Sequence, residues 1–191
     1  LFGGRAIGIA VYMGANKLET VKVLMETGVL LDYRTFIGGS VLTNTVDNED
    51  SDPEVIRVIL EKMKSSCSER EFTKMVNYRV KATTFKWKAL YLVSKGLNRM
   101  GLSKSGLMYS ISLWSGTTAL NRAVVRGDIE IVKILLDNGA DPYVENDLGM
   151  NAFDICDEAG PFPRIHRALH EHLNGSKKST EEEENGTDKN E

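Results

Sequence analysis

Hydrophobic and polar positions follow a helical period across residues 115–147. Four apolar residues recur at i, i+1, i+4 and i+5, a spacing that places them on one face of a helix: Ile131, Val132, Leu135 and Leu136. Gly127 precedes this stripe and Gly139 follows it. Because glycine adopts the left-handed conformation in which helices often end, the pattern predicts two short helices separated by a tight turn.

The first of these two helices opens with a recognisable motif. Its positions match a T-P-L-H-x-A pattern at Thr118, Ala119, Leu120 and Ala123. Ala119 stands in place of the usual Pro, and Asn121 in place of the usual His. Residues 115–147 therefore resemble one ankyrin repeat. The resemblance implies an all-α solenoid of stacked helix pairs with projecting turns, an array with which that family binds other proteins.

A shift of 33 residues tests whether the motif repeats downstream. The same residue classes return at Gly149, Ala152, Phe153, Cys156, Gly160, Ile165 and Leu169. No further glycine follows at the expected offset, so residues 148–173 are predicted to form a C-terminal capping repeat. We expect the helices at 129–137 and 163–172 to be in contact.

The N-terminal part keeps the same register less strictly. Residues 1–33 match it at Gly3, Ala6, Ile7, Ala10 and Gly14. Residues 34–64 carry the second-helix stripe at Val55, Ile56, Ile59 and Leu60. Residues 1–64 are therefore predicted to form two divergent ankyrin repeats. Since the chain begins within this register and without Met, we expect it to be a fragment of a longer repeat array.

Residues 65–114 interrupt the period with a basic insert. From Lys62 to Gly106 there are eleven Lys or Arg and two acidic residues, a local charge of +9, whereas the whole chain has a formal charge of −3. A helix is predicted at about 85–100, with an apolar stripe at Phe85, Ala89, Leu92 and Val93. The segments SSCSERE and GLSKSG on either side are expected to be loops.

Three interpretations of the insert remain open. Its helix can dock on the repeats through the apolar stripe, with the lysines in solvent. A basic amphipathic helix can also lie on an anionic membrane surface or enter a groove of a partner. Lysines between aromatic residues can also bind nucleic acid. For the last two interpretations, the candidate anion-binding residues are Lys86, Lys88 and Lys95.

The C-terminal residues 174–191 contain no aliphatic or aromatic side chain and include four consecutive glutamates. Such a segment has too little apolar surface to offset its ordering entropy. We expect it to be a disordered acidic tail.

Catalytic and metal-binding motifs are not recognisable in the chain. No nucleophile elbow, P-loop or kinase signature occurs. His166 and His170 have metal-chelating i, i+4 spacing, but without an HExxH glutamate or a cysteine pair an exposed helix face is the favoured interpretation. We expect no enzyme activity, cofactor or metal. Two cysteines without a disulfide pattern, and no apolar run long enough to span a bilayer, favour an intracellular location, cytoplasmic or nuclear.

The ankyrin resemblance also implies where a protein partner binds, on the projecting turns and the adjoining inner helix face. The corresponding positions are Trp114, Ser115, Thr117, Val125, Arg126, Glu145, Asp147, Met150 and Glu158. Trp114 and Met150 are expected on adjacent turns as an apolar anchor beside Arg126, although Trp114 can instead pack on the insert. The leading hypothesis is a protein-interaction module. The alternatives are a regulatory ankyrin domain of an enzyme or ion channel, or binding of anionic membrane or nucleic acid through the insert.

Overall fold

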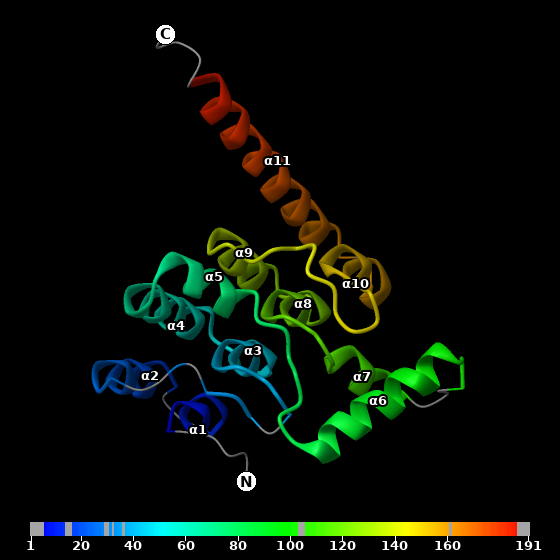
Figure 1. The fold of residues 1–191 in the computed structure, drawn as a ribbon. Coiled ribbons are helices and arrows are strands. Elements are labelled where there is room, and N and C mark those ends of the chain that lie inside the picture. Colours follow the sequence, from blue (N-terminus) through cyan, green and yellow to red (C-terminus); the bar gives the residue numbers. More distant parts are fainter. Residues whose placement is uncertain are drawn as a thin grey trace.

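The computed structural model describes residues 6–13, 17–28, 31, 33–35, 37–102, 106–160 and 162–186. Gly3 and Gly14 of the first predicted repeat lie outside these residues. The described elements are all helices (Figure 1). In chain order they are α1 (Ala6–Met13), α2 (Lys17–Glu26), α3 (Val41–Asp47), α4 (Pro53–Ser66), α5 (Glu69–Val76), α6 (Phe85–Arg99), α7 (Gly106–Trp114), α8 (Ala119–Val125), α9 (Ile129–Asp137), α10 (Ala152–Ala159) and α11 (Pro163–Gly186).

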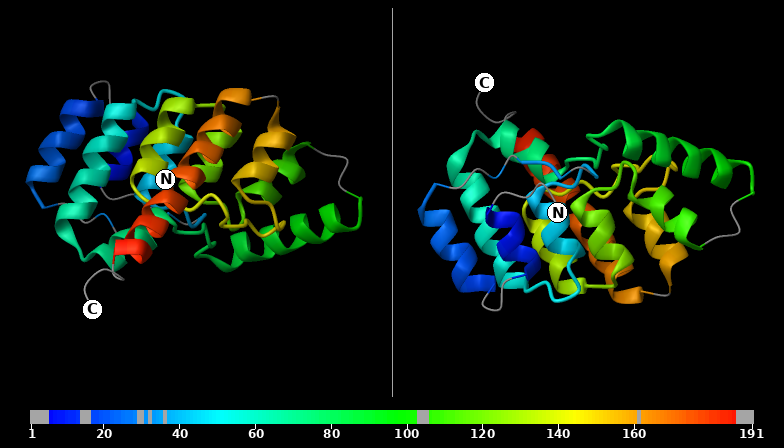
Figure 2. Two further views of the ribbon diagram at one scale, coloured as in Figure 1. Left: turned by 90° about the horizontal axis from the view of Figure 1, so that it is seen from above. Right: turned by 90° about the horizontal axis from the view of Figure 1, so that it is seen from below.

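Four helix pairs stack side by side as a solenoid (Figure 2). The first helices of the pairs form one row, α1, α3, α8 and α10, and the second helices form another, α2, α4, α9 and α11. Each helix contacts its neighbours in its own row as well as its partner in the pair. The predicted helical solenoid is confirmed, including the contact between α9 and α11.

The stack continues without a gap across the insert. Although residues 67–118 separate the second pair from the third in sequence, α3 contacts α8 directly and α4 contacts α9. The insert leaves the solenoid after α4 and returns at α8, with α6 and α7 paired as a hairpin that projects to one side (Figure 1). A solenoid tolerates such an insertion because the chain ends of the insert meet at one repeat boundary.

One continuous hydrophobic core runs through the stack. Side chains from successive second helices are almost completely buried between neighbouring repeats, among them Ile56, Ile59, Ile131, Leu135, Ile165 and Leu169. Two of these, Ile131 and Leu135, belong to the stripe that predicted the helix at 129–137. Each repeat therefore buries its apolar face against the next repeat rather than around a central core.

Local capping explains where the helices begin. The Thr118 side chain accepts a hydrogen bond from the Asn121 amide, and the Asp128 carboxylate accepts from the amides of Glu130 and Ile131. These side chains satisfy amide groups that the first helical turn leaves unpaired. Gly127, with a φ of 72°, makes the turn between α8 and α9.

The loops that precede the first helix of each repeat lie in a row, and the segment 77–84 lies between the loops of the second and third repeats. Its Val80 exchanges backbone hydrogen bonds with Gly116 and Thr117, 2.9 Å each. On its other side the Thr83 hydroxyl donates to the carbonyl of Thr35 at 3.1 Å. The insert therefore replaces the missing neighbour between the loop of the second repeat and the loop of the third.

Arg122 joins the second and third repeats at the point where the insert returns to the solenoid. Its guanidinium Nε donates to the carboxylate of Asp47 at the end of α3 at 2.6 Å, and its Nη2 also pairs with that carboxylate. Both side chains are largely buried. On the other side the ring of Trp114 lies 4.4 Å from the guanidinium. Nearby, Arg126 donates to the backbone carbonyls of Asn48 and Glu49.

Helix α5 was not predicted, because SSCSERE was interpreted as a loop. Ser68 and Glu71 form a capping box, and Phe72 and Val76 are buried. The Ser-x-x-Glu spacing was a readable signal for this helix. At its C-terminus, Asn77 donates to the carbonyl of Gly139 and accepts from the Asp141 amide, so α5 is attached to the end of α9.

Helix α11 runs past Leu173, where the capping repeat was predicted to end. Its backbone is helical to Gly186, which differs from the expectation that disorder begins at Asn174. Extending an existing helix fixes one residue per hydrogen bond gained, whereas starting one is costly. The packed part of α11 around Ile165 and Leu169 supplies that start. Residues 187–191 of the tail lie outside the described residues.

A glycine at 116 is expected to be required for the contact between loops. Its φ is 75°, and a Cβ there would lie 2.6 Å from the backbone nitrogen of Asp147. At Gly139, with a φ of 82°, a Cβ would meet nothing within 4 Å. We expect Gly139→Ala to lower the free energy of unfolding by about 1 kcal/mol through backbone strain alone. Gly116→Ala should lower it by about 2 kcal/mol more through the added overlap. Urea unfolding of both variants measures the difference, and equal losses would contradict the overlap.

The pair of Arg122 and Asp47 is expected to couple the second repeat to the third. A double-mutant cycle with Arg122→Ala and Asp47→Ala should give a coupling free energy of about 1–3 kcal/mol, because both groups are largely removed from water. The exposed pair of Lys22 and Glu19 is the control, for which we expect less than about 0.5 kcal/mol. Equal coupling energies in the two cycles would refute the assigned role of Arg122.

Candidate partner-binding surface

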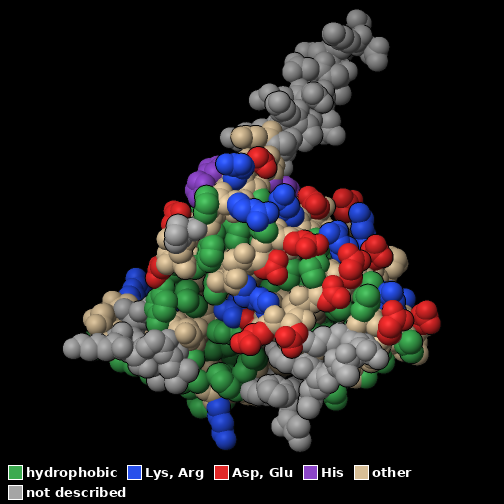
Figure 3. All heavy atoms as spheres, turned by 180° about the vertical axis from the view of Figure 1, so that it is seen from behind, with side chains coloured by type: hydrophobic (Ala, Val, Ile, Leu, Met, Phe, Trp, Pro, Cys, Tyr) green, Lys and Arg blue, Asp and Glu red, His purple; other side chains and the backbone are tan. Residues whose placement is uncertain are grey.

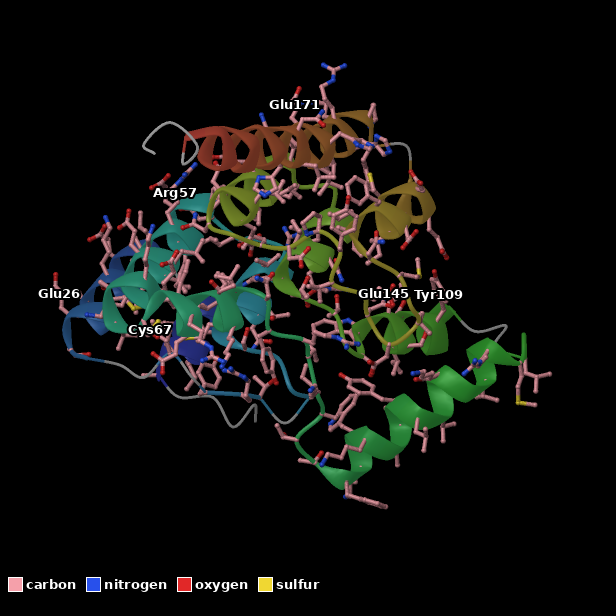
Figure 4. The ribbon with its side chains drawn as sticks, turned by 45° about the horizontal axis from the view of Figure 1, so that its top comes forward. Glu26, Arg57, Cys67, Tyr109, Glu145 and Glu171 are labelled. Carbon is pink, nitrogen blue, oxygen red and sulfur yellow. The ribbon has the colours of Figure 1, made fainter. Side chains whose placement is uncertain are left out.

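A groove lies between the hairpin of α6 and α7 on one side and the loop that precedes α10, with α10 itself, on the other. Its volume is about 550 Å³. Figure 4 shows the hairpin beside the loop between α9 and α10, with Tyr109 and Glu145 labelled. The groove is lined by Lys95, Arg99, Tyr109, Asp147, Leu148, Gly149, Met150 and Glu158. We call it the hairpin groove.

A smaller hollow of about 290 Å³ continues along α6. It shares Lys95 and Asp147 with the hairpin groove and is otherwise lined by Lys81, Ala82, Lys88, Tyr91, Leu92 and Ser115. Helix α6 therefore forms one wall of both hollows, and the loops of the repeats form the other.

Asp147 organises the loop wall. Its carboxylate accepts hydrogen bonds from the Arg79 guanidinium, at 2.8 Å, and from the Ser115 hydroxyl. Its backbone amide donates to the carbonyl of Ser115 at 2.9 Å. Arg79 also donates to the carbonyl of Gly116, so the segment 77–84 and two successive loops meet at one carboxylate. Because Arg79 balances its charge, Asp147 contributes little net negative potential to the groove.

Tyr91 and Tyr109 hold the hairpin against the repeats. The Tyr91 hydroxyl donates to the carbonyl of Ile37 at 3.1 Å, and the Tyr109 hydroxyl donates to the carboxylate of Glu158. Burial raises the pKa of Tyr91 to about 12. Burial and the hydrogen bond to Glu158 raise the pKa of Tyr109 to about 12. Both phenols are therefore neutral donors at physiological pH.

Lys95 and Arg99 give the groove a positive wall. They are one helical turn apart on α6, and within the described part of the chain neither forms an ion pair. Lys81 and Lys88 extend the cationic lining into the smaller hollow. Glu158 adds one negative charge at the α10 side of the groove. With Asp147 balanced, the α6 wall stays positive and favours a ligand with acidic groups.

The predicted partner-binding residues divide between this groove and the interior. Asp147, Met150 and Glu158 line the hairpin groove, and Glu145 is exposed on the loop before α10. The expectation that Ser115 and Thr117 face a partner is not met, because both are buried, 5% and 1% exposed. They lie where the segment 77–84 and the next loop close over the turn.

The other three predicted residues serve the repeat interface. Trp114 stacks on Arg122 of the third repeat, and Arg126 donates a hydrogen bond to the second repeat. Val125 packs against the hydrophobic core. Trp114 is thus a half-buried residue at the end of α7 that stacks on Arg122, and it does not line the groove that contains Met150. The predicted pairing of Trp114 with Met150 as an apolar anchor finds no support in this geometry.

The predicted apolar stripe of α6 faces outward, whereas it was expected to pack on the repeats. Phe85, Leu92 and Val93 are exposed, whereas Tyr91 and Ser94 are buried against the repeats. The prediction that α6 docks on the repeats through Phe85, Ala89, Leu92 and Val93 is therefore wrong. The reason is that Tyr91 combines an apolar ring with a hydroxyl that reaches a backbone carbonyl, which an aliphatic side chain cannot do. Of the three candidate lysines, Lys88 and Lys95 line the hollows and Lys86 does not.

Several residues of the groove and its loop wall were not predicted from the sequence. Arg99 lies four residues after Lys95, so the helical spacing already joined it to the candidate lysines. Tyr109 and Arg79 gave no such signal, because their partners Glu158 and Asp147 are 49 and 68 residues away.

Among the residues that the structure describes, no group of three or more His, Cys, Asp or Glu side chains is placed to hold a metal ion. The rings of His166 and His170 lie 4.5 Å apart and both contact Phe153, an arrangement of packed rings. No helix among the described residues is long and apolar enough to cross a membrane.

Comparison with known proteins agrees with the repeat pattern. Residues 115–147 match the family model described as Ankyrin repeat. Among solved structures, one similar chain comes from the crystal structure of the yeast ribosomal protein Rps3 in complex with its chaperone Yar1. The TM-score is 0.56 at 20% identity, over 85% of this chain and 86% of that chain, so this likeness shows the fold alone. A search of curated proteins found no match.

These findings define the class of protein. Residues 115–147 are an ankyrin repeat. The chain as a whole has the fold of an all-α helical solenoid that carries an irregular, basic helical insert.

Glu158 is expected to control the ionisation of Tyr109. Removing its negative charge in Glu158→Gln should lower the pKa of Tyr109 from about 12 and leave that of Tyr91 near 12. The measurement is an alkaline titration of tyrosinate absorbance, with Tyr109→Phe used to assign the signal. An unchanged titration of Tyr109 would contradict the contact.

The same shifts predict how stability depends on alkaline pH. An unfolded tyrosine loses its proton near pH 10, whereas Tyr91 and Tyr109 keep theirs until about pH 12. Their stabilising contribution is therefore fully present below pH 10 and is lost as the pH rises through about 12. In urea unfolding, Tyr91→Phe/Tyr109→Phe should lose less stability than the wild type over this window.

Proposed function

We propose that this protein is a non-catalytic protein-interaction module that binds a partner protein in the hairpin groove. The observation that carries the proposal is the placement of the insert: α6 and α7 enclose a groove of about 550 Å³ with the loop between α9 and α10 and with α10 itself. The ankyrin repeat and the likeness to a chain from a chaperone complex support a protein partner.

The lining indicates what kind of partner segment fits. Lys95 and Arg99 present positive charge along the α6 wall. On the opposite wall Asp147 is balanced by Arg79, and Glu158 accepts a hydrogen bond from Tyr109. Leu148 and Met150 add apolar surface between them. A segment with acidic side chains flanking an apolar residue complements this lining, and its association should weaken as salt increases.

The test uses charge reversal at Lys95, which is partly exposed, and at three exposed positions. Lys95→Glu/Arg99→Glu changes the groove, and Lys64→Glu/Lys133→Glu makes the same charge change on the second-helix row. We expect both variants to unfold at the wild-type temperature. In pull-downs from nuclease-treated lysate, at least one protein should be retained by the wild type and the control variant but lost by the groove variant. Its purified form should then bind the groove variant at least about tenfold more weakly.

Two outcomes would count against this proposal. Identical sets of retained proteins for all three forms would exclude the groove as the binding surface. Retention that disappears entirely after nuclease treatment would assign the lysines to nucleic acid instead. The role as a regulatory domain of an enzyme or ion channel stays a prediction without a specific supporting observation.

A further inference from the structure

The outward face of α6 is an apolar strip that no other described part of the chain covers. Phe85 is 84% exposed, Leu92 73% and Met100 71%, and Val93 and Leu102 are also exposed. Phe85, Leu92 and Val93 follow the i, i+7, i+8 spacing of one helix face, and Met100 continues it. The strip spans the full length of α6, roughly 22 Å at 1.5 Å per residue.

Helix α6 is fixed in the orientation that exposes this strip. On its opposite face Tyr91 and Ser94 are buried, and the Tyr91 hydroxyl is bonded to the second repeat. Rotating the helix to bury Leu92 would expose the Tyr91 ring and break that hydrogen bond. The apolar strip is therefore a stable surface feature. None of its residues lines the hairpin groove, and Leu92 at its edge also lines the smaller hollow.

Positive side chains border the strip. Lys86 lies on one flank, and Lys88 and Arg99 lie on the other, all three exposed. No Asp or Glu occurs anywhere between Glu71 and Asp128. Figure 3 shows the molecule from behind, where acidic side chains are frequent on the side that carries α2 and α4.

We propose that α6 binds the surface of an anionic lipid membrane. An apolar helix face bordered by lysines is the arrangement with which helices lie in a membrane interface, their apolar side chains inserted between headgroups and their cations paired with lipid phosphates. With 15 residues α6 is shorter than the ~20 that a spanning helix requires. A nucleic acid would use the lysines but gain nothing from Leu92 and Val93. A flat membrane contacts the whole strip on this projecting helix at once.

The experiment is sedimentation with lipid vesicles, using the full chain. Vesicles of phosphatidylcholine with phosphatidylserine are compared with vesicles of phosphatidylcholine alone. The wild type should bind the anionic vesicles at least about tenfold more tightly than the neutral ones. Phe85→Ser/Leu92→Ser and Lys86→Glu/Lys88→Glu should each weaken that binding at least about tenfold. Val23→Ser, at a valine exposed 58% on α2, and Lys64→Glu/Lys133→Glu should bind like the wild type.

Each alternative occupant gives a different result. Binding to an oligonucleotide that depends on the lysines but not on Phe85 and Leu92, without vesicle binding, overturns the membrane proposal in favour of nucleic acid. Concentration-dependent dimers that Phe85→Ser/Leu92→Ser abolishes, again without vesicle binding, assign the strip to a second copy of the chain. Arg99 lines the hairpin groove and also borders the strip, so Phe85→Ser/Leu92→Ser separates the two proposals, because neither residue lines that groove. Loss of vesicle binding in this variant with unchanged retention of partner proteins assigns the strip independently of the groove.

Discussion

The contact of α3 with α8 carries the solenoid across its insert, and the rest of the structure depends on it. If the second repeat did not stack directly on the third, the hydrophobic core would divide into two units of two repeats, fewer than such arrays usually need. Arg122 marks this boundary, because its guanidinium pairs with Asp47 on one side and stacks on Trp114 on the other. The same side chain therefore joins the repeats and fixes the end of the insert.

Once that boundary is closed, the insert can only lie on the outside of the stack. The segment 77–84 continues the row of loops through its hydrogen bonds to Thr117 and Thr35, and Tyr91 attaches α6 to the second repeat. These bonds give α6 two different faces. One faces the loops and, with α7, encloses the hairpin groove, and the other presents an apolar strip bordered by lysines. The two proposed activities of the protein follow from these two faces.

The sequence predicted the repeat architecture because the repeats are local. A repeat of this kind is defined by spacings within 33 residues, such as the stripe at Ile131 and Leu135 and the glycine at 127, and the packing that follows joins neighbours in sequence. The helix of the insert was also readable from its period. The buried side of this helix could not be predicted in the same way. The number of apolar residues favoured the side of Phe85, Leu92 and Val93, whereas the structure buries Tyr91.

The candidate site was only partly predictable, for the same physical reason. The resemblance to ankyrin repeats implied that Asp147, Met150 and Glu158 lie near the turn that opens the fourth repeat, and the sequence predicted that Lys88 and Lys95 share a basic helix. Glu158 lies on α10 itself. Only the tertiary structure decided that these two sets meet in one region, because the hairpin returns to the fourth repeat across 49 residues between Tyr109 and Glu158. It also decided that Ser115 and Thr117 are covered. Contacts between distant segments depend on where an insert docks, and no local period encodes that position.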